Sequence, residues 1–282
     1  MVSIVAWMGS WVAASFCLPI AAATGPATPA TTRPSVPAAT QAADAAATQP
    51  ISSGDSRVDA ILDRLERRGD AIEDLSAKLT FQRFDELVEE RLTRHGELLY
   101  RRDEPNASFL VRFDDMVIDR VIRRQKAWYV FDGRWFVEKQ ESTKTVVRRE
   151  IVRPGERINP FKLGQGPFPL PFGQKKADIL GRFVVKRIEP IPGDPPESDH
   201  LLLVPRTDSD MADRYRKLDF YIARSLELPV RIRLYQKDDK IVTADFADVT
   251  VNTGLAAGRF ELPVPEGWQL IEEPLETMGG QR

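Results

Sequence analysis

The sequence is poor in the residues that build metal centres and disulfide frameworks. Its 282 residues include one cysteine, Cys17, and two histidines, His95 and His200. Cys17 lies in an apolar N-terminal run, so removal of that run would leave no thiol and would exclude disulfides and cysteine metal sites. Catalytic zinc sites usually need several imidazoles, so most zinc chemistry is excluded too. We therefore expect no metal and no cofactor.

The sequence also lacks the motifs of common enzyme classes and an excess of one charge. No G-x-S-x-G, H-E-x-x-H, Walker A or G-x-G-x-x-G pattern occurs. Neither histidine stands at a motif spacing from a nucleophile, so each is expected to be exposed or satisfied. The 40 basic and 42 acidic residues give a net charge of −2, which offers no electrostatic argument for nucleic acid. We expect a protein that is not an enzyme and does not bind nucleic acid.

Adjacent carboxylates keep one enzymatic alternative open. Paired carboxylates could hydrolyse a glycosidic bond, although adjacency in sequence is no evidence for the required geometry. Asp114-Asp115 and Asp238-Asp239 are typical of turns, and Glu272-Glu273 follows the last expected strand. A glycan hydrolase is therefore a weaker alternative.

The N-terminal region predicts export. Residues 1–23 are apolar and end in Ala21-Ala22-Ala23, which predicts a secretory signal peptide, although no Lys or Arg follows Met1. An uncleaved anchor is the alternative, since the run is near the ~20 residues that a membrane span needs. A lipoprotein signal at Cys17 is disfavoured because Phe16 precedes it. Residues 24–54, rich in Ala, Thr and Pro, predict a disordered linker.

Residues 55–276 have the patterns of one folded domain, followed by a tail over 277–282. Asp55 or Ser56 is a candidate helix cap. The apolar residues after it recur at helical spacing, as in Val58, Ile61, Leu62 and Leu65. From about Leu75 the hydrophobic period changes to two, which predicts strands. One amphipathic helix therefore precedes a series of strands.

The strand signals continue to the end of the domain. Asp132-Gly133 between two β-rich runs predicts a hairpin. Further strands are expected over 145–152, 183–188, 201–204, 218–223, 230–235 and 241–251. Short strands with turns between them predict an antiparallel meander rather than βαβ units. The predicted fold class is mainly β (α+β).

The segment 159–173, NPFKLGQGPFPLPFG, combines loop-forming prolines and glycines with large apolar side chains. Loops are normally polar, so an apolar loop must cover a core, line a groove or contact a membrane or partner. Two alternatives stay open: a cap on the end of a barrel, or a lid over an apolar cavity. The apolar side chains of this segment are Phe161, Leu163, Phe168, Leu170 and Phe172.

Arginine pairs stand on three expected strands: Arg101-Arg102, Arg123-Arg124 and Arg148-Arg149. Adjacent residues of a strand point to opposite faces, so one arginine of each pair points inward. An inward arginine in an apolar barrel needs a partner and could serve as a latch. The alternative is a pair at a solvated edge.

Four motifs carry a resemblance to a known family. They are Leu79-Thr80-Phe81-Gln82, the stretch Gly96 to Arg102 (GELLYRR), Lys217 to Ile222 with Leu228 to Ile232, and the closing stretch Gly258 to Trp268 (GRFELPVPEGW). With the N-terminal helix, their order resembles that of the LolA-type periplasmic lipoprotein carriers and related outer-membrane lipoprotein-sorting proteins. The resemblance covers roughly Ser56 to Pro274.

The resemblance implies an unclosed antiparallel β half-barrel, with an N-terminal helix and a short helix or loop as a lid over an apolar cavity. It implies a monomeric periplasmic carrier for lipoprotein acyl chains or another lipid, with an inner-membrane donor and an outer-membrane acceptor as partners. A family arginine that contacts the lid corresponds by position to Arg102. Asp103 stands where the family has proline.

An aromatic cavity could bind an acyl chain without polar specificity, at about 0.8 kcal/mol per buried CH₂. The alternative for each candidate is ordinary core packing. A sensor or regulatory domain of the same fold, docking to a protein partner, is the alternative function. Besides the loop residues, the candidate lipid-binding residues are Leu79, Phe81, Phe109, Val111, Phe113, Trp128, Val130 and Trp135.

Overall fold

The computed structural model describes residues 52–103, 106–118, 120–156 and 172–275. The chain divides into two units, residues 1–51 and 52–282, and the described residues all belong to the second. In those residues, no helix has the length and apolar character needed to cross a bilayer. The expected signal peptide, nearly all of the linker, the tail, and Phe161, Leu163, Phe168 and Leu170 of the apolar loop lie outside the described residues.

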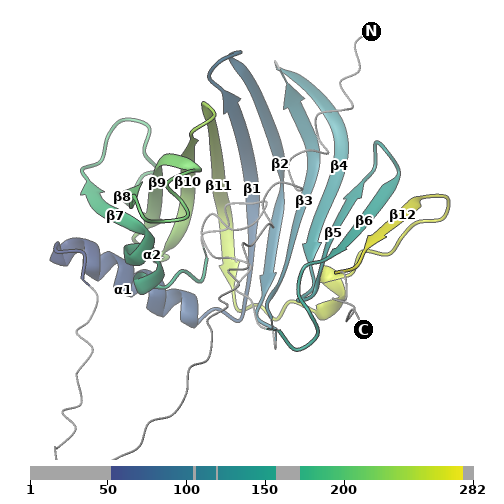
Figure 1. The fold of residues 1–282 in the computed structure, drawn as a ribbon, viewed down its shortest axis with the longest axis horizontal. Coiled ribbons are helices and arrows are strands. Elements are labelled where there is room, and N and C mark those ends of the chain that lie inside the picture. Colours follow the sequence, from purple (N-terminus) through teal and green to yellow (C-terminus); the bar gives the residue numbers. More distant parts are fainter. Residues whose placement is uncertain (1–51, 104–105, 119, 157–171, 276–282) are drawn as a thin grey trace, which may run out of the picture. The chain divides into compact units, whose positions relative to one another are not determined.

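One sheet of twelve strands and two α-helices make up the described unit (Figure 1). The elements are α1 (Ser56–Asp70), β1 (Asp74–Asp85), β2 (Glu90–Arg101), β3 (Ser108–Ile118), β4 (Val121–Phe131), β5 (Trp135–Gln140), β6 (Thr145–Glu150), α2 (Lys176–Arg182), β7 (Phe183–Ile188), β8 (Ser198–Pro205), β9 (Tyr215–Ala223), β10 (Leu228–Gln236), β11 (Lys240–Val251), the 3₁₀ turn η2 (Ala257–Phe260) and β12 (Gln269–Glu273).

The strand order is β12-β6-β5-β4-β3-β2-β1-β11-β10-β9-β8-β7. Each neighbouring pair is antiparallel except β12 and β6, which are parallel. The end strands β12 and β7 do not pair with each other, so the curved sheet stays open (Figure 1). The predicted mainly β, unclosed half-barrel with an N-terminal helix is therefore confirmed.

Helix α1 forms as its sequence predicts. The side chain of Asp55 caps it by accepting a hydrogen bond of 2.8 Å from the Arg57 N–H, which satisfies one of the free donors of the first turn. The apolar stripe of Val58, Ile61 and Leu65 is buried, and the helix contacts α2, β7 and β10. Burial of this stripe holds α1 against the β7–β10 part of the sheet.

The β4–β5 hairpin also forms as predicted. One oxygen of Asp132 accepts hydrogen bonds from the backbone N–H groups of Arg134 and Trp135, at 2.9 and 2.7 Å. Gly133 adopts a left-handed φ of 97°, which glycine tolerates without steric cost.

The positions predicted from the sequence for two carboxylate pairs were wrong. Asp114-Asp115 lies inside β3 rather than in a turn, because the extra residue Asp114 forms a bulge between the pairs His95–Asp115 and Gly96–Phe113. Glu272-Glu273 lies inside β12 rather than beyond the last strand.

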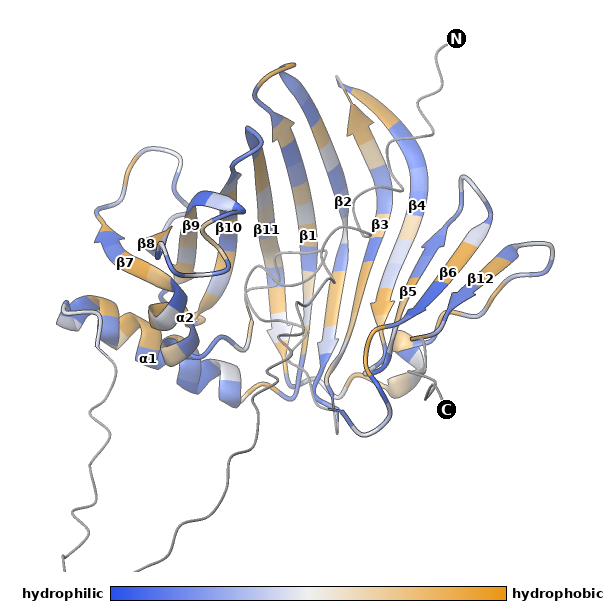
Figure 2. Ribbon diagram, viewed as in Figure 1, coloured by the Kyte–Doolittle hydropathy of each residue, from blue (hydrophilic) through white to orange (hydrophobic). Residues whose placement is uncertain are grey.

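The register defines two faces of the sheet, which we call inner and outer. Residues directly opposite one another in antiparallel strands share a face, so Leu79, Gly96 and Phe113 belong to the same face. On β8 the alternate residues Asp199, Leu201 and Leu203 lie on this inner face, where Asp199 pairs with Arg64 of α1 at 3.3 Å. Helix α1 therefore covers the inner face over the β7–β10 part of the sheet. Figure 2 shows hydrophobic and hydrophilic residues alternating along β1, β2 and β11.

Candidate functional site

A connected row of aromatic rings covers the inner face of β1 to β5. Phe81 and Phe113 have ring centroids 6.0 Å apart, and Phe113 meets Tyr129 edge-on at 6.2 Å. Phe136 lies 6.4 Å from Tyr129 and 6.3 Å from Phe109. Pairs at these separations add about 0.5–1.5 kcal/mol each to the gain from burial. The row is a continuous set of apolar rings within the described part of this face.

The candidate lipid-binding residues divide between the two faces. Five of them, Leu79, Phe81, Phe109, Val111 and Phe113, lie on the inner face. Phe81 is half-buried, whereas the other four are buried, with Val111 fully inaccessible. The structure places these five residues on one face, where the rings of Phe81 and Phe113 are in contact.

Trp128, Val130 and Trp135 lie on the outer face instead. Val130 belongs to a second, smaller core, against which Trp135 packs. Trp128 lies under the ammonium group of Lys139, which also contacts the ring of Trp268. We call this core the outer cluster; its members are Leu99, Leu110, Val130, Val137, Val146 and Phe260, with Trp135, Leu255, Leu262 and Trp268 at its margin.

The end of the apolar loop reaches the inner face. Phe172 is buried and packs edge-on against Phe246 at 5.1 Å, and Phe246 is the β11 partner of Leu79. Gly173 follows with a left-handed φ of 70°. A Cβ on Gly69 of α1 would lie 3.3 Å from the Gly173 Cα, so the two backbones approach closely.

Two lysines that follow Gly173 in the chain form ion pairs with helix α1. Lys175 pairs with Asp70 at 2.6 Å, and Lys176 pairs with Asp63 at 2.9 Å and with Asp59 at 3.5 Å. Glu66 accepts a hydrogen bond of 2.9 Å from the Lys176 backbone N–H. Asp70 raises the pKa of Lys175. We call this group of ion pairs the α1 clamp.

Arg102 binds the C-terminal end of α1. Its guanidinium donates hydrogen bonds to the carbonyl oxygens of Ile72, Gly69 and Asp70 at 2.9, 3.0 and 3.0 Å. A cation at the C-terminal end of a helix satisfies free carbonyl groups and interacts favourably with the helix dipole. The described partners of Arg102 therefore include the end of the covering helix, while the loop residues 157–171 lie outside the described part of the chain.

A second arginine, Arg94, is buried on the inner face, and the sequence patterns did not predict it. It stands opposite Phe81 of β1 and Met116 of β3. Its guanidinium lies 5.4 Å from the Phe113 ring and 3.7 Å from the Met116 sulfur, and it hydrogen-bonds to the Tyr129 hydroxyl. The sequence signal that could have revealed Arg94 is the two-residue period of strand β2. Arg94 lies two residues before Gly96, so both residues belong to the inner face.

A charged triad occupies the β5–β6–β12 side of the inner face. Arg149 lies 2.9 Å from Glu138 and 2.6 Å from Glu273. Burial raises the pKa of Glu138, and Arg149 opposes this shift. Arg148 points to the outer face and pairs with Glu272. The predicted inward and outward arginines are confirmed for this pair.

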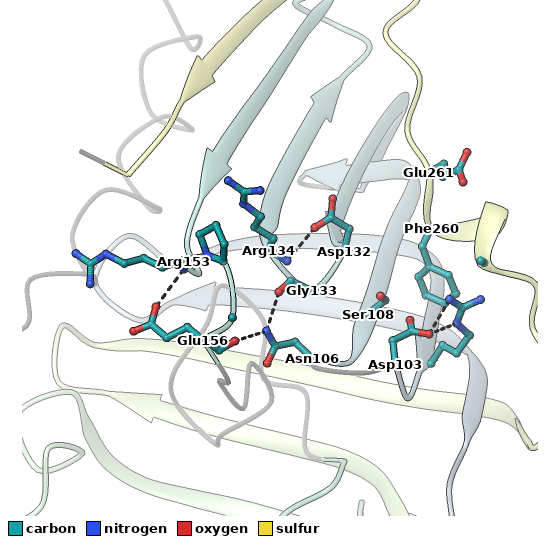
Figure 3. A pocket seen from close by; sticks show the side chains of 14 residues that line it. Asp103, Asn106, Ser108, Asp132, Gly133, Arg134, Arg153, Glu156, Phe260 and Glu261 are labelled. Carbon is teal, nitrogen blue, oxygen red and sulfur yellow. Dashed lines mark hydrogen bonds and ion pairs between the residues drawn. The ribbon is translucent and has the colours of Figure 1, made fainter. Parts of the chain in front are cut away.

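A polar pocket of about 490 Å³ lies where β2, β3 and the β4–β5 turn meet η2 (Figure 3). Arg101 pairs with Asp103 at 2.7 Å. The buried Asn106 donates hydrogen bonds to the carbonyl oxygens of Gly133 and Glu156 at 2.9 and 3.0 Å. Among the described residues, the Oδ2 oxygen of Asp103 is buried without a hydrogen-bond partner. Ala257 and Phe260 contribute apolar side chains to the lining of the pocket.

The histidines differ in their surroundings. His95 is half-exposed and lies 2.8 Å from Asp115. His200 is buried on the outer face, with Nδ1 3.2 Å from Asp194 and Nε2 3.3 Å from Asp219. No group of three or more metal-ligating side chains comes together within the described ranges.

Comparisons with known proteins find low similarity to several solved structures. No family model matches the chain, and no curated protein matches its sequence. A conserved protein from Thermus thermophilus has 13% identity and a TM-score of 0.45, over 77% of this chain and 99% of that one. The Mycobacterium tuberculosis lipoprotein LppX has 9% identity and a TM-score of 0.42, over 72% and 99%. A LolA superfamily protein from Nitrosomonas europaea has 12% identity and a TM-score of 0.34, over 72% and 97%.

The described fold is an open antiparallel half-barrel, and an N-terminal helix covers part of its inner face. At these identities and TM-scores the likeness says nothing about ligands or partners, which must be argued from the side chains.

Proposed function

We propose that the protein is a non-catalytic periplasmic carrier that binds the acyl chains of lipoproteins or another lipid on its inner face and moves them toward the outer membrane. The observation that carries the proposal is the connected aromatic row from Phe81 to Phe136. Rings in contact offer a continuous apolar surface, and each buried CH₂ of a chain adds about 0.8 kcal/mol. The predicted export of the chain is consistent with this role.

Release of the ligand would require the inner face to open at modest cost. The covering helix α1 is held by ion pairs and hydrogen bonds, namely the α1 clamp and Arg102. Exposed ion pairs are typically worth less than about 1 kcal/mol each. In this proposal Arg102 fixes the end of α1 and thereby the position of the cover, a role similar to the lid contact that the family resemblance implies for it.

Native mass spectrometry with lipid extraction, on protein from the envelope fraction, tests the proposal. The natural protein is expected to carry an acyl-chain lipid. Phe81→Gln puts an amide into the aromatic row at a half-buried position, and an amide without a partner there costs roughly 1–3 kcal/mol. The lipid-bound fraction should fall about tenfold. Trp128→Gln makes the same kind of change on the outer face and should leave lipid binding unchanged.

A protein that carries no lipid and binds none when lipid is added would contradict the carrier. That result would favour the alternative, a sensor or regulatory domain that docks to a protein partner. One observation supports this alternative: Phe109, Val111 and Phe113 are already buried in the described structure, so a ligand must displace existing contacts.

A further inference from the structure

A small pocket on the outer face is lined by two arginines from different strands. It has a volume of about 240 Å³, and its lining includes Arg91 of β2, Arg233 of β10 and, between them, Phe84 of β1 and Thr243 of β11. The strand order β2-β1-β11-β10 places the two arginines on the strands that flank β1 and β11 (Figure 1). We call this site the arginine pocket.

Neither arginine of the pocket has a carboxylate in contact with it among the described residues. The Arg91 guanidinium lies over the ring of Phe84, 5.1 Å from the ring centroid. The Arg233 guanidinium donates a hydrogen bond to the hydroxyl of Tyr235. A guanidinium does not lose its proton in a protein. Two permanent positive charges therefore line one pocket, and their contacts there are with uncharged groups.

The neighbouring arginine of β10 shows what is missing beside Arg233. Arg231 lies on the same strand and face, and it forms an ion pair with Asp245, its partner across the strands on β11. Two residues further along, the β11 partner of Arg233 is Thr243. A threonine hydroxyl can donate a hydrogen bond to an anion but carries no charge. An anion from solution would supply beside Arg233 the charge that Asp245 supplies beside Arg231.

The carboxylate that faces Arg233 from the other side is already engaged. Asp219 of β9 is the cross-strand partner of Arg233 and attracts it at longer range. Its oxygens lie 3.3 Å from His200 Nε2 and 3.9 Å from Lys217 Nζ. Asp219 therefore serves other groups as well, and it does not fill the arginine pocket.

We propose that the arginine pocket binds phosphate, either as free orthophosphate or as the phosphate group of a small monoester. This inference concerns the outer face and does not rest on the carrier proposal. A phosphate monoester carries close to two negative charges at pH 7 and has three strong acceptor oxygens. Guanidinium groups form strong, charge-assisted hydrogen bonds with such oxygens. The hydroxyl of Thr243 and the amide of Gln82, which also line the pocket, are further donors.

Isothermal titration calorimetry of the full protein at low salt tests the proposal with four probes: inorganic phosphate, glycerol 3-phosphate, acetate and glycerol. We expect saturable binding of a phosphate, at least about tenfold tighter than that of acetate, because only a dianion balances both guanidinium groups. Glycerol should not bind. Tighter binding of glycerol 3-phosphate would identify a phosphorylated organic ligand, and tighter binding of inorganic phosphate would identify the free ion; both results support the proposal.

Three variants and one control locate the effect. Arg91→Met and Arg233→Met should each weaken phosphate binding at least about tenfold. Thr243→Asp gives Arg233 the kind of cross-strand partner that Arg231 has, so it should abolish phosphate binding in a protein that still unfolds cooperatively in urea. This variant also covers the case in which Arg233→Met does not fold. Arg124→Met removes an exposed arginine of the outer face that does not line the pocket and should change nothing.

The results are separate from those that test the carrier. Absence of saturable phosphate binding, an equal loss in Arg124→Met, or unchanged binding in Thr243→Asp would overturn the phosphate site. None of these outcomes bears on lipid binding by the inner face, which the Phe81→Gln and Trp128→Gln proteins test.

Discussion

The inner and outer faces of β2 to β5 are built from the same runs of sequence, yet they pack differently. Inward residues such as Phe109 and Phe113 form a wide aromatic row. Outward residues of the same strand include Arg112, which pairs with Glu97 at 3.0 Å, and Leu110, which joins the outer cluster. The difference shows that a strand's composition says little about a binding surface until its register is known.

The two faces are also covered in different ways. The segment over residues 255–268 closes the outer cluster with Phe260 and Trp268. That cover belongs to the chain that runs directly into β12. Besides its apolar contacts, it has a hydrogen bond from Lys139 to the Pro263 carbonyl and an ion pair between Arg259 and Glu97. The cover of the inner face by α1 depends on the α1 clamp as well as on the apolar stripe of the helix.

The largest expected effect comes from Gly96, the position at which strands β2 and β3 must stay in register. A Cβ on Gly96 would lie 1.7 Å from the carbonyl oxygen of Arg112, in the rigid backbone of β3. Gly96→Ala must therefore separate β2 from β3 beside the bulge. We expect more than about 4 kcal/mol of lost stability, beyond ordinary overpacking, measured by urea unfolding or as insoluble expression.

Gly181→Ala in α2 is the matched control, because a Cβ added at Gly181 would have nothing within 4 Å. It should be neutral or slightly stabilising, since alanine has the higher helix propensity. A fully stable Gly96→Ala protein would mean that β2 and β3 pair in a different register.

A pair of equal truncations tests the functional difference between the faces. Phe113→Ala on the inner face and Phe260→Ala in the outer cluster each remove a buried ring, and each should cost about 3 kcal/mol. Only Phe113→Ala should also weaken palmitate binding, because only that ring belongs to the aromatic row. Urea unfolding and ligand displacement measure the two quantities separately. Equal loss of binding in both variants would remove the distinction.

The smallest expected effect concerns the α1 clamp. Hydrogen bonds from Ser52 and Ser53, and the charge of Lys176, lower the pKa of Asp59 from 3.8 to about 2, against the effect of burial. A carboxyl with a lowered pKa stabilises the fold above its unfolded pKa and loses that contribution as the pH falls. Between about pH 4 and 2, hydrogen exchange in α1 should accelerate, by an amount equivalent to less than about 1 kcal/mol.

Asp59→Asn should remove this part of the acid dependence. Lys175 has a raised pKa, so its own contribution is complete below about pH 10.5 and is lost above it. Exchange rates in α1 that do not change with acid would show that apolar packing alone holds the helix.

Much of the fold could be predicted because its signals are local. The change of hydrophobic period near Leu75, the Asp132-Gly133 turn and the Asp55 cap each act over a few residues. Strand β12 was missed because its five residues are all exposed and carry no burial pattern. Its position depends on ion pairs with β6, as between Arg148 and Glu272, and such long-range contacts have no local signal.

The candidate site was predicted only in part, because the position of its residues also depends on long-range contacts that have no local signal. The run Trp128 to Phe131 is apolar throughout, so its alternation cannot show which residues face inward. Pairing with β5 decides this by placing Val130 opposite Val137 in the outer cluster. Arg94 was hidden because Arg94-His95-Gly96 is a polar stretch, and only the pairing with Phe81 and Met116 places its charge among the rings.

The parallel strand β12 has a consequence for how copies of the protein behave toward one another. Its ion-pair partners in β6 lie 124 residues earlier in the chain, so β6 stays an unpaired edge until β12 reaches it. An unpaired edge with Val146 and Val147 is a template for strands of other molecules. Pairing with β12 moves the free edge to a short strand that carries Glu272 and Glu273, and short, charged edge strands disfavour further pairing.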